Sequence, residues 1–167
     1  MHEVVERVVQ RLREHNLSFG SQAILIGGMA MQYYDMRKAG ADIDLMIENA
    51  DYQALARQYP EKRKDIFGDL GVVVGEFEIW RSIALFDYDF FRKDAIEEGG
   101  ILIVSIDRLL WMRVCAMNVE KYRNDLELMK NYYYRHFTNP DYLVEARTHE
   151  TSYAKTGGTV FGGKYED

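Results

Sequence analysis

The segment 22-QAILIGGMAMQYYDMRKAGADIDLMIE-48 decides the fold of this chain. The apolar run at 23–26 ends in two glycines, and a short continuous apolar run is typical of a strand buried on both faces. A helix is predicted over 29–37, followed by a turn at 38–41. Residues 42–48 then alternate, with Asp42, Asp44 and Met46 on one side and Ile43, Leu45 and Ile47 on the other. This period of two predicts a second strand.

The remaining segments extend this pattern into a mixed α/β (α+β) fold, with helices packed on a mixed sheet. Further helices are predicted over 3–15, from about residue 51 to Pro60, over 106–117 behind Ser105 as N-cap, and from Asn118 to about His136. Strands are predicted near 72–75, 77–85 and 101–105, and the polar segment 60–71 is predicted to be a loop. We expect one domain over 1–147, followed by a flexible glycine-rich tail over 148–167.

The composition is that of an ordinary globular protein. The 167 residues are 47% apolar and 29% charged, and no run reaches the roughly 20 apolar residues that span a bilayer. The first residues carry acids and lack the apolar segment of a signal peptide, and the single Cys115 forms no disulfide framework, so we expect a cytoplasmic protein without membrane contact. The net charge of −6 argues against broad binding to nucleic-acid backbones.

Two carboxylates share one face of the strand predicted at 42–48. Residues two apart in a strand point the same way, so Asp42 and Asp44 project together while Ile43 and Leu45 point to the other side. Two like charges held this close repel each other unless a cation neutralises them, and hard oxygen ligands suit Mg²⁺ or Mn²⁺. The alternative for such a pair is a solvated acidic face on an edge strand.

Gly27 and Gly28 stand where the buried strand turns into the helix. Glycine adopts positive φ and lets a ligand approach the backbone, and the unpaired N–H groups of a helix start suit a phosphate. An ordinary tight turn is the alternative for two glycines alone. Together with Asp42 and Asp44, they suggest a metal on one side of the site and a triphosphate on the other.

A Gly-Gly after an apolar strand, a helix, and then Asp-apolar-Asp-apolar resembles the signature of the nucleotidyltransferase superfamily that includes DNA polymerase β. It is most similar to the small prokaryotic single-domain members related to abortive-infection toxins of toxin–antitoxin systems. Lys38 stands four positions before Asp42, where those relatives often carry a basic residue. The segment 77-FEIWRSI-83 resembles the strand of their third carboxylate, which places Glu78 there instead of the usual Asp.

The resemblance, which covers roughly 22–130, also implies further site residues. Arg113 stands where a Lys is usual, Lys121 lies in a basic approach, and Asp125 matches an acidic position. Ser21 would line the phosphate pocket with the two glycines, and Arg81 or Lys38 would balance its charge. A rival third carboxylate is offered by Asp87 or Asp89 in 86-FDYDFF-91, and we prefer Glu78 because it lies inside the predicted strand.

The implied activity is ATP- or other NTP-dependent transfer of a nucleoside monophosphate to a hydroxyl of a protein, an RNA end or a small molecule. Asp42, Asp44 and Glu78 would hold two Mg²⁺ (or Mn²⁺) ions, which align the triphosphate and the attacking hydroxyl. The process would be a toxin–antitoxin or phage-defence system, with a protein partner or a second copy of the chain supplying specificity. The alternative is a catalytically inactive binding or regulatory module of the same fold.

Overall fold

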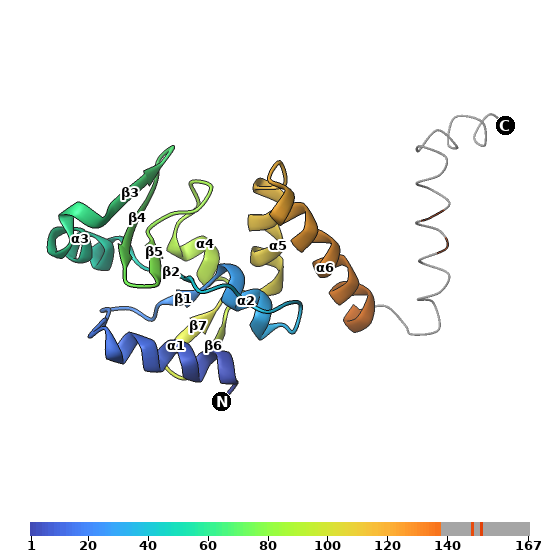
Figure 1. Cartoon of the computed structure of the whole chain (residues 1–167), viewed down its shortest axis with the longest axis horizontal. Helices are drawn as coiled ribbons and strands as arrows, with labels where there is room; N and C mark the ends of the chain where they lie inside the picture. The colour runs from blue at the N-terminus through green and yellow to red at the C-terminus, as the bar shows by residue number, and fades with distance from the viewer. Residues whose placement is uncertain (138–147, 149–150, 152–167) are drawn as a thin grey trace. The chain divides into compact units, whose positions relative to one another are not determined.

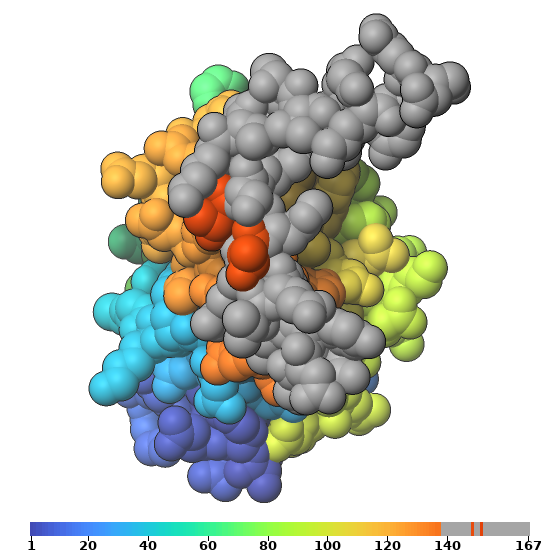
Figure 2. Space-filling model, turned by 90° about the vertical axis from the view of Figure 1, so that its right-hand side faces the viewer, coloured from blue at the N-terminus to red at the C-terminus, as the bar shows by residue number. Residues whose placement is uncertain are grey.

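The computed structural model describes residues 1–137, Thr148 and Thr151, and all other residues are grey in Figure 1 and Figure 2. The chain divides into two compact units, Met1–Leu126 and Glu127–Asp167. The sheet and every predicted site residue belong to the first unit. The tail predicted over 148–167 lies outside the described residues except for the two threonines.

The first unit is built on a mixed sheet, which confirms the predicted fold class. Its seven strands in the described part of the chain follow the order β3-β4-β5-β2-β1-β7-β6. β2 pairs parallel with β5 and β1 pairs parallel with β7, whereas all other neighbours are antiparallel. The strands are β1 (Ile24–Leu25), β2 (Ile43–Met46), β3 (Arg63–Ile66), β4 (Asp69–Val74), β5 (Phe77–Trp80), β6 (Ile96–Glu98) and β7 (Ile101–Ile103).

The helices precede, separate and follow these strands. They are α1 (Glu3–Glu14), α2 (Gly27–Tyr33), α3 (Asn49–Gln58), the 3₁₀ turn η1 (Pro60–Lys62), α4 (Tyr88–Arg92), α5 (Ile106–Cys115) and α6 (Glu120–Phe137). Ser105 caps α5 by accepting a hydrogen bond from the N–H of Arg108, as predicted. None of the helices in the described residues has the length and hydrophobicity needed to cross a bilayer.

The hydrophobic core lies on the face of the sheet opposite the predicted carboxylates. Ile43, Leu45 and Ile47 are buried there, as their alternation predicts, together with Phe77 and Ile79 of β5. The apolar stripe of α1 (Val4, Val5, Val8 and Leu12) and the buried side of α3 (Tyr52, Leu55 and Ala56) belong to the same cluster. This packing holds β2 and β5 in place from one side, while their other face carries Asp44 and Glu78 beside the buried Met46 and Trp80.

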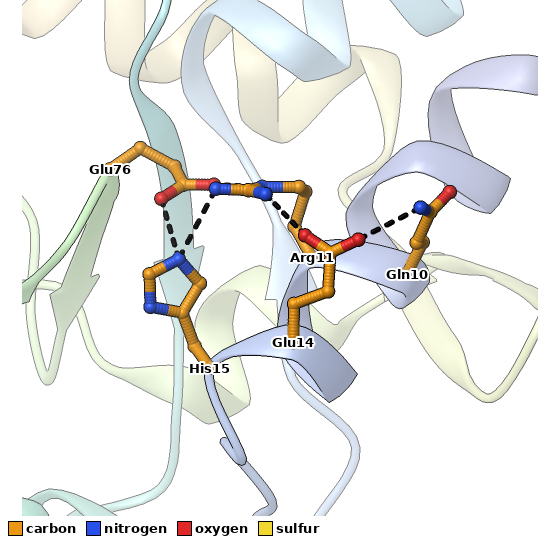
Figure 3. A network of polar contacts seen from close by, with 5 residues as sticks. All are labelled: Gln10, Arg11, Glu14, His15 and Glu76. Carbon is orange, nitrogen blue, oxygen red and sulfur yellow. Dashed lines mark hydrogen bonds and ion pairs between the residues drawn. The ribbon is translucent and has the colours of Figure 1, made fainter.

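A polar network ties α1 to the start of β5 (Figure 3). Glu76, which directly precedes β5, forms an ion pair with Arg11, and its other carboxylate oxygen lies 2.8 Å from Nε2 of His15. Arg11 also pairs with Glu14, whose other oxygen accepts a hydrogen bond from Gln10. The bond from Arg11 lowers the pKa of Glu76 to about 2, so this carboxylate stays ionised at neutral pH.

The predicted loop over 60–71 is wrong, because this segment contains η1, β3 and the first half of β4. β3 is an edge strand whose four residues are mostly solvent-exposed, so its sequence lacks the apolar alternation of a half-buried strand. Its pairing with β4 is decided by backbone hydrogen bonds that the side chains do not reveal. The strand predicted over 77–85 is also too long, since β5 ends at Trp80.

Candidate active site

Asp44 and Glu78 are direct neighbours on adjacent parallel strands. The register of β2 and β5 pairs Ile43 with Phe77 and Asp44 with Glu78, so the carboxylates share the face opposite the core. Asp42 lies immediately before β2 and is exposed. All three side chains line one cavity of about 610 Å³. The structure therefore brings the three predicted carboxylates to one pocket, although residues 44 and 78 are far apart in sequence.

The two glycines lie against this carboxylate group. Ile26 donates its N–H to the carbonyl of Asp44 over 3.0 Å, which places the end of β1 beside Asp44. Gly27 follows with φ +64°, and a β-carbon there would overlap the Asp44 carboxylate, with Cγ 2.8 Å away. Because it has no β-carbon, Gly27 allows both the left-handed backbone and the close approach to the Asp44 carboxylate. Gly28 also lines the cavity but leaves ordinary space for a β-carbon.

The environment of Asp44 disfavours its ionised form. Burial is the main cause, and repulsion from Asp42 and then from Glu78 adds to it, raising the pKa of Asp44 from 3.8 to about 6. A hydrogen bond from the Trp80 side chain and the charge of Arg113 oppose this rise. A cation bound beside Asp44 would reverse the balance, since opposite charge favours the carboxylate.

Glu78 has a cationic partner within the protein. The Nζ of Lys64 on β3 lies 2.8 Å from Oε1 of Glu78, and both side chains are about one-third exposed. Lys64 also lies over the Trp80 ring, with Nζ 5.7 Å from its centroid. This contact was not predicted, because the segment that forms β3 was assigned to a loop.

A second cluster of charges forms the cationic side of the cavity. Arg37 donates two hydrogen bonds to Asp125, of 2.6 and 3.0 Å, and Nε of the buried Arg113 lies 2.9 Å from the same carboxylate. Arg113 also stacks over Tyr122 at 4.9 Å, and burial lowers its pKa. Arg37, Arg113 and Lys121 line the cavity, so two of its three basic residues were predicted. Arg37 was not predicted, since the resemblance aligns the basic position with the adjacent Lys38.

Three predicted phosphate-binding residues lie elsewhere. Ser21 precedes β1, at the end opposite Gly27, and its N–H bonds to Asp51. Arg81 follows the end of β5 and lines a second cavity, of about 510 Å³. Lys38 is exposed and does not line the carboxylate cavity. The structure thus leaves Ser21, Arg81 and Lys38 outside the pocket of Asp44.

The rival carboxylates also lie outside it. Asp87 and Asp89 line the same separate cavity as Arg81, and Asp87 caps α4 by accepting from the N–H of Phe90. Asp69 does line the carboxylate cavity, a position that the sequence analysis missed. Its oxygens accept the N–H groups of Ala84 and Leu85 over 2.6 and 2.8 Å, so they shape the loop after β5.

The donor chemistry of the pocket suits a hard divalent cation, but its carboxylates as placed do not form a complete ligand group. Among the described residues, no three or more His, Cys, Asp or Glu side chains form a group that could hold a metal ion. Asp42, Asp44 and Glu78 nevertheless supply carboxylate oxygens to one pocket, and burial together with their repulsion raises the pKa of Asp44. The ion pair with Lys64 occupies Oε1 of Glu78, so a cation bound by all three carboxylates would coordinate the other oxygen or displace the ammonium.

No protein-family model matches this chain, and no curated protein matches it significantly. The resemblance carried by Gly27, Gly28, Asp42 and Asp44 therefore stays a prediction.

Proposed function

We propose that this protein is a metal-dependent nucleotidyltransferase, which moves a nucleoside monophosphate from an NTP to a hydroxyl acceptor. The observation that carries the proposal is the pairing of Asp44 with Glu78 on adjacent parallel strands, beside Asp42 and Gly27 in one cavity. The cavity volume of about 610 Å³ is within the range of small-molecule sites. Its acidic and basic sides match the two needs of nucleotidyl transfer, which are cation binding and phosphate neutralisation.

Each side of the cavity has a distinct role. Asp42, Asp44 and Glu78 would hold Mg²⁺ or Mn²⁺, which when bound neutralises the triphosphate and activates the attacking hydroxyl. Arg113 and Lys121, which line the same cavity, would offer positive charge to the phosphates. Asp125 orients Arg37 and Arg113, since it contacts both guanidinium groups and is itself buried. Gly27 keeps the backbone close to Asp44 without steric conflict.

Transfer of label from an NTP tests the proposal directly. The protein is incubated with each α-³²P-labelled NTP, Mg²⁺ or Mn²⁺, and a cell lysate, and labelled protein, RNA and small molecules are then separated. We expect Asp44→Asn and the double variant Asp42→Ala/Asp44→Ala to lose at least about 100-fold in rate, as for other essential electrostatic groups. Asp35→Asn, at an exposed carboxylate after α2, is the matched control and should retain the wild-type rate. Transfer that survives both Asp44 variants would contradict the assigned site.

The acceptor belongs to one of three chemical classes, a protein hydroxyl, an RNA 3′ end or a small molecule. The fraction that carries the label identifies the class. If the labelled acceptor is one that a toxin of this kind would modify, the result supports a role in toxin–antitoxin or phage-defence systems. If a partner protein supplies acceptor specificity, label transfer should require the lysate fraction that contains this partner.

A non-catalytic module of the same fold is the second candidate, and the Lys64–Glu78 ion pair favours it. With Glu78 neutralised by Lys64, the pocket has one fewer carboxylate for a catalytic cation. Calorimetry separates the two functions: micromolar binding of Mg²⁺-NTP together with label transfer supports the enzyme. The absence of measurable Mg²⁺-NTP affinity in an intact, folded protein supports the module.

A further inference from the structure

The Lys64–Glu78 pair results from the order of the strands. The register places Lys64 opposite Gly71, and Gly71 opposite Trp80, so these residues lie in one row across β3, β4 and β5. Residues of one row share a face of the sheet, and Glu78, two positions before Trp80, shares it as well. Lys64 therefore extends over the face that carries Asp44, although β3 is two strands away from Glu78 in the sheet order.

Gly71 provides the space for this arrangement. A β-carbon at position 71 would lie 2.7 Å from Cε3 of Trp80, so a side chain there would conflict with the indole. With glycine at this position, the Trp80 ring lies over β4 and the Lys64 stem reaches past it. The ammonium is then held between the Trp80 ring and the Glu78 carboxylate.

We propose that Lys64 is a built-in competitor for the divalent cation at Glu78. The inference rests on the proposed function, because it assumes that Glu78 is a ligand of that cation. The ammonium supplies the positive charge that a third metal-ligating carboxylate requires, and it repels a second cation nearby. Lys64 occupies Oε1 of Glu78, so a cation shared by Asp42, Asp44 and Glu78 binds against the charge of the ammonium. Lys64 therefore weakens cation binding and is a positioning residue for Glu78.

Direct measurement of Mn²⁺ binding tests the role of Lys64 without an activity assay. Free Mn²⁺ is followed by electron paramagnetic resonance during titration of the full-length protein. We expect Lys64→Met to bind Mn²⁺ about two- to fivefold more tightly, the range that corresponds to a partly exposed ion pair. Lys64→Arg should retain the wild-type affinity, because it keeps the positive charge. Lys62→Met removes the same charge at an exposed position of η1 and should also leave the affinity unchanged.

A double-mutant cycle shows whether Lys64 acts through Glu78. In a Glu78→Gln background, Lys64→Met should no longer tighten Mn²⁺ binding, since the carboxylate for which Lys64 and Mn²⁺ compete has been removed. Equal affinities of wild type and Lys64→Met, or the same tightening in the Glu78→Gln background, overturn the inference while leaving the proposed function intact. Mn²⁺ binding that is absent from wild type and all variants, or unaffected by Asp44→Asn, overturns the proposed metal site and the inference together.

Discussion

Gly27 packs so closely against Asp44 that a β-carbon at position 27 would overlap the carboxylate. The backbone of Gly27 is also left-handed, with φ +64°. A residue with a β-carbon at position 27 would therefore meet both a steric overlap with Asp44 and a strained left-handed backbone. This contact links the end of β1 to the predicted catalytic strand, and it makes glycine a requirement for the geometry of Asp44.

Gly27→Ala should displace Asp44 and destabilise the fold by about 2 kcal/mol, because left-handed strain adds to the overlap. Mn²⁺ binding should be lost with it. Gly28→Ala is the control for stability: its β-carbon would meet the nearest atoms at 3.7 Å, and alanine favours the helix, so we expect no loss. Urea unfolding measures both variants. A Gly27→Ala protein as stable as Gly28→Ala would show that the backbone at 27 relaxes freely.

Asp44→Asn should stabilise the protein while abolishing transfer. In the fold Asp44 has a pKa of about 6 and in the unfolded chain about 3.8, so between these values the folded state binds more protons. Stability falls as pH rises through this window, and the loss is complete above it. We expect Asp44→Asn to gain about 2–3 kcal/mol at pH 8 in EDTA, and nothing at pH 3.5.

The pH dependence is measured by urea unfolding of wild type and variant across this range. Asp35→Asn, at an exposed position, should follow the wild-type curve at every pH. If Asp44→Asn were less stable than wild type at pH 8, the claim that burial and nearby charges destabilise the ionised Asp44 would be contradicted. Addition of Mg²⁺ should reduce the difference between wild type and Asp44→Asn, since the cation stabilises the ionised form.

Asp125→Asn should destabilise the first unit by about 3–5 kcal/mol, because it leaves the buried Arg113 and the adjacent Arg37 without their counter-charge. The control on the same helix is Glu127→Gln, whose pair with Lys130 is largely exposed and should contribute less than about 0.5 kcal/mol. Denaturant unfolding measures both changes. A loss below about 1 kcal/mol in Asp125→Asn would show that the two arginines find other partners or water.

Glu76→Gln should weaken the attachment of α1 to β5. The pKa of Glu76 is lowered from 4.5 to about 2, so its contribution is present above pH 4.5 and is lost as pH falls toward 2. Because the side chain is partly exposed, we expect about 1 kcal/mol at pH 7 and less in 1 M salt. Glu14→Gln, at the more exposed end of the network, is the control, with an expected effect within 0.5 kcal/mol. An identical loss in both variants would assign the effect to the network as a whole.

Local patterns predicted the elements that carry the site. The alternation of 42–48 correctly placed Ile43 and Leu45 in the core and Asp44 on the other face, because side chains of a strand alternate strictly. The apolar run before Gly27 likewise predicted a buried strand. The exposed edge strand β3 escaped prediction, since solvent on its side chains removes the pattern that would reveal it.

The order of residues is therefore enough to predict the periodicity of each segment and the need for glycine at a tight strand-to-helix turn. Only the tertiary structure decided that Glu78 lies beside Asp44, that Lys64 reaches Glu78 and that Arg37 meets Asp125. The physical reason is that side-chain direction repeats locally along a strand or helix, whereas the register between distant strands depends on how the whole core packs.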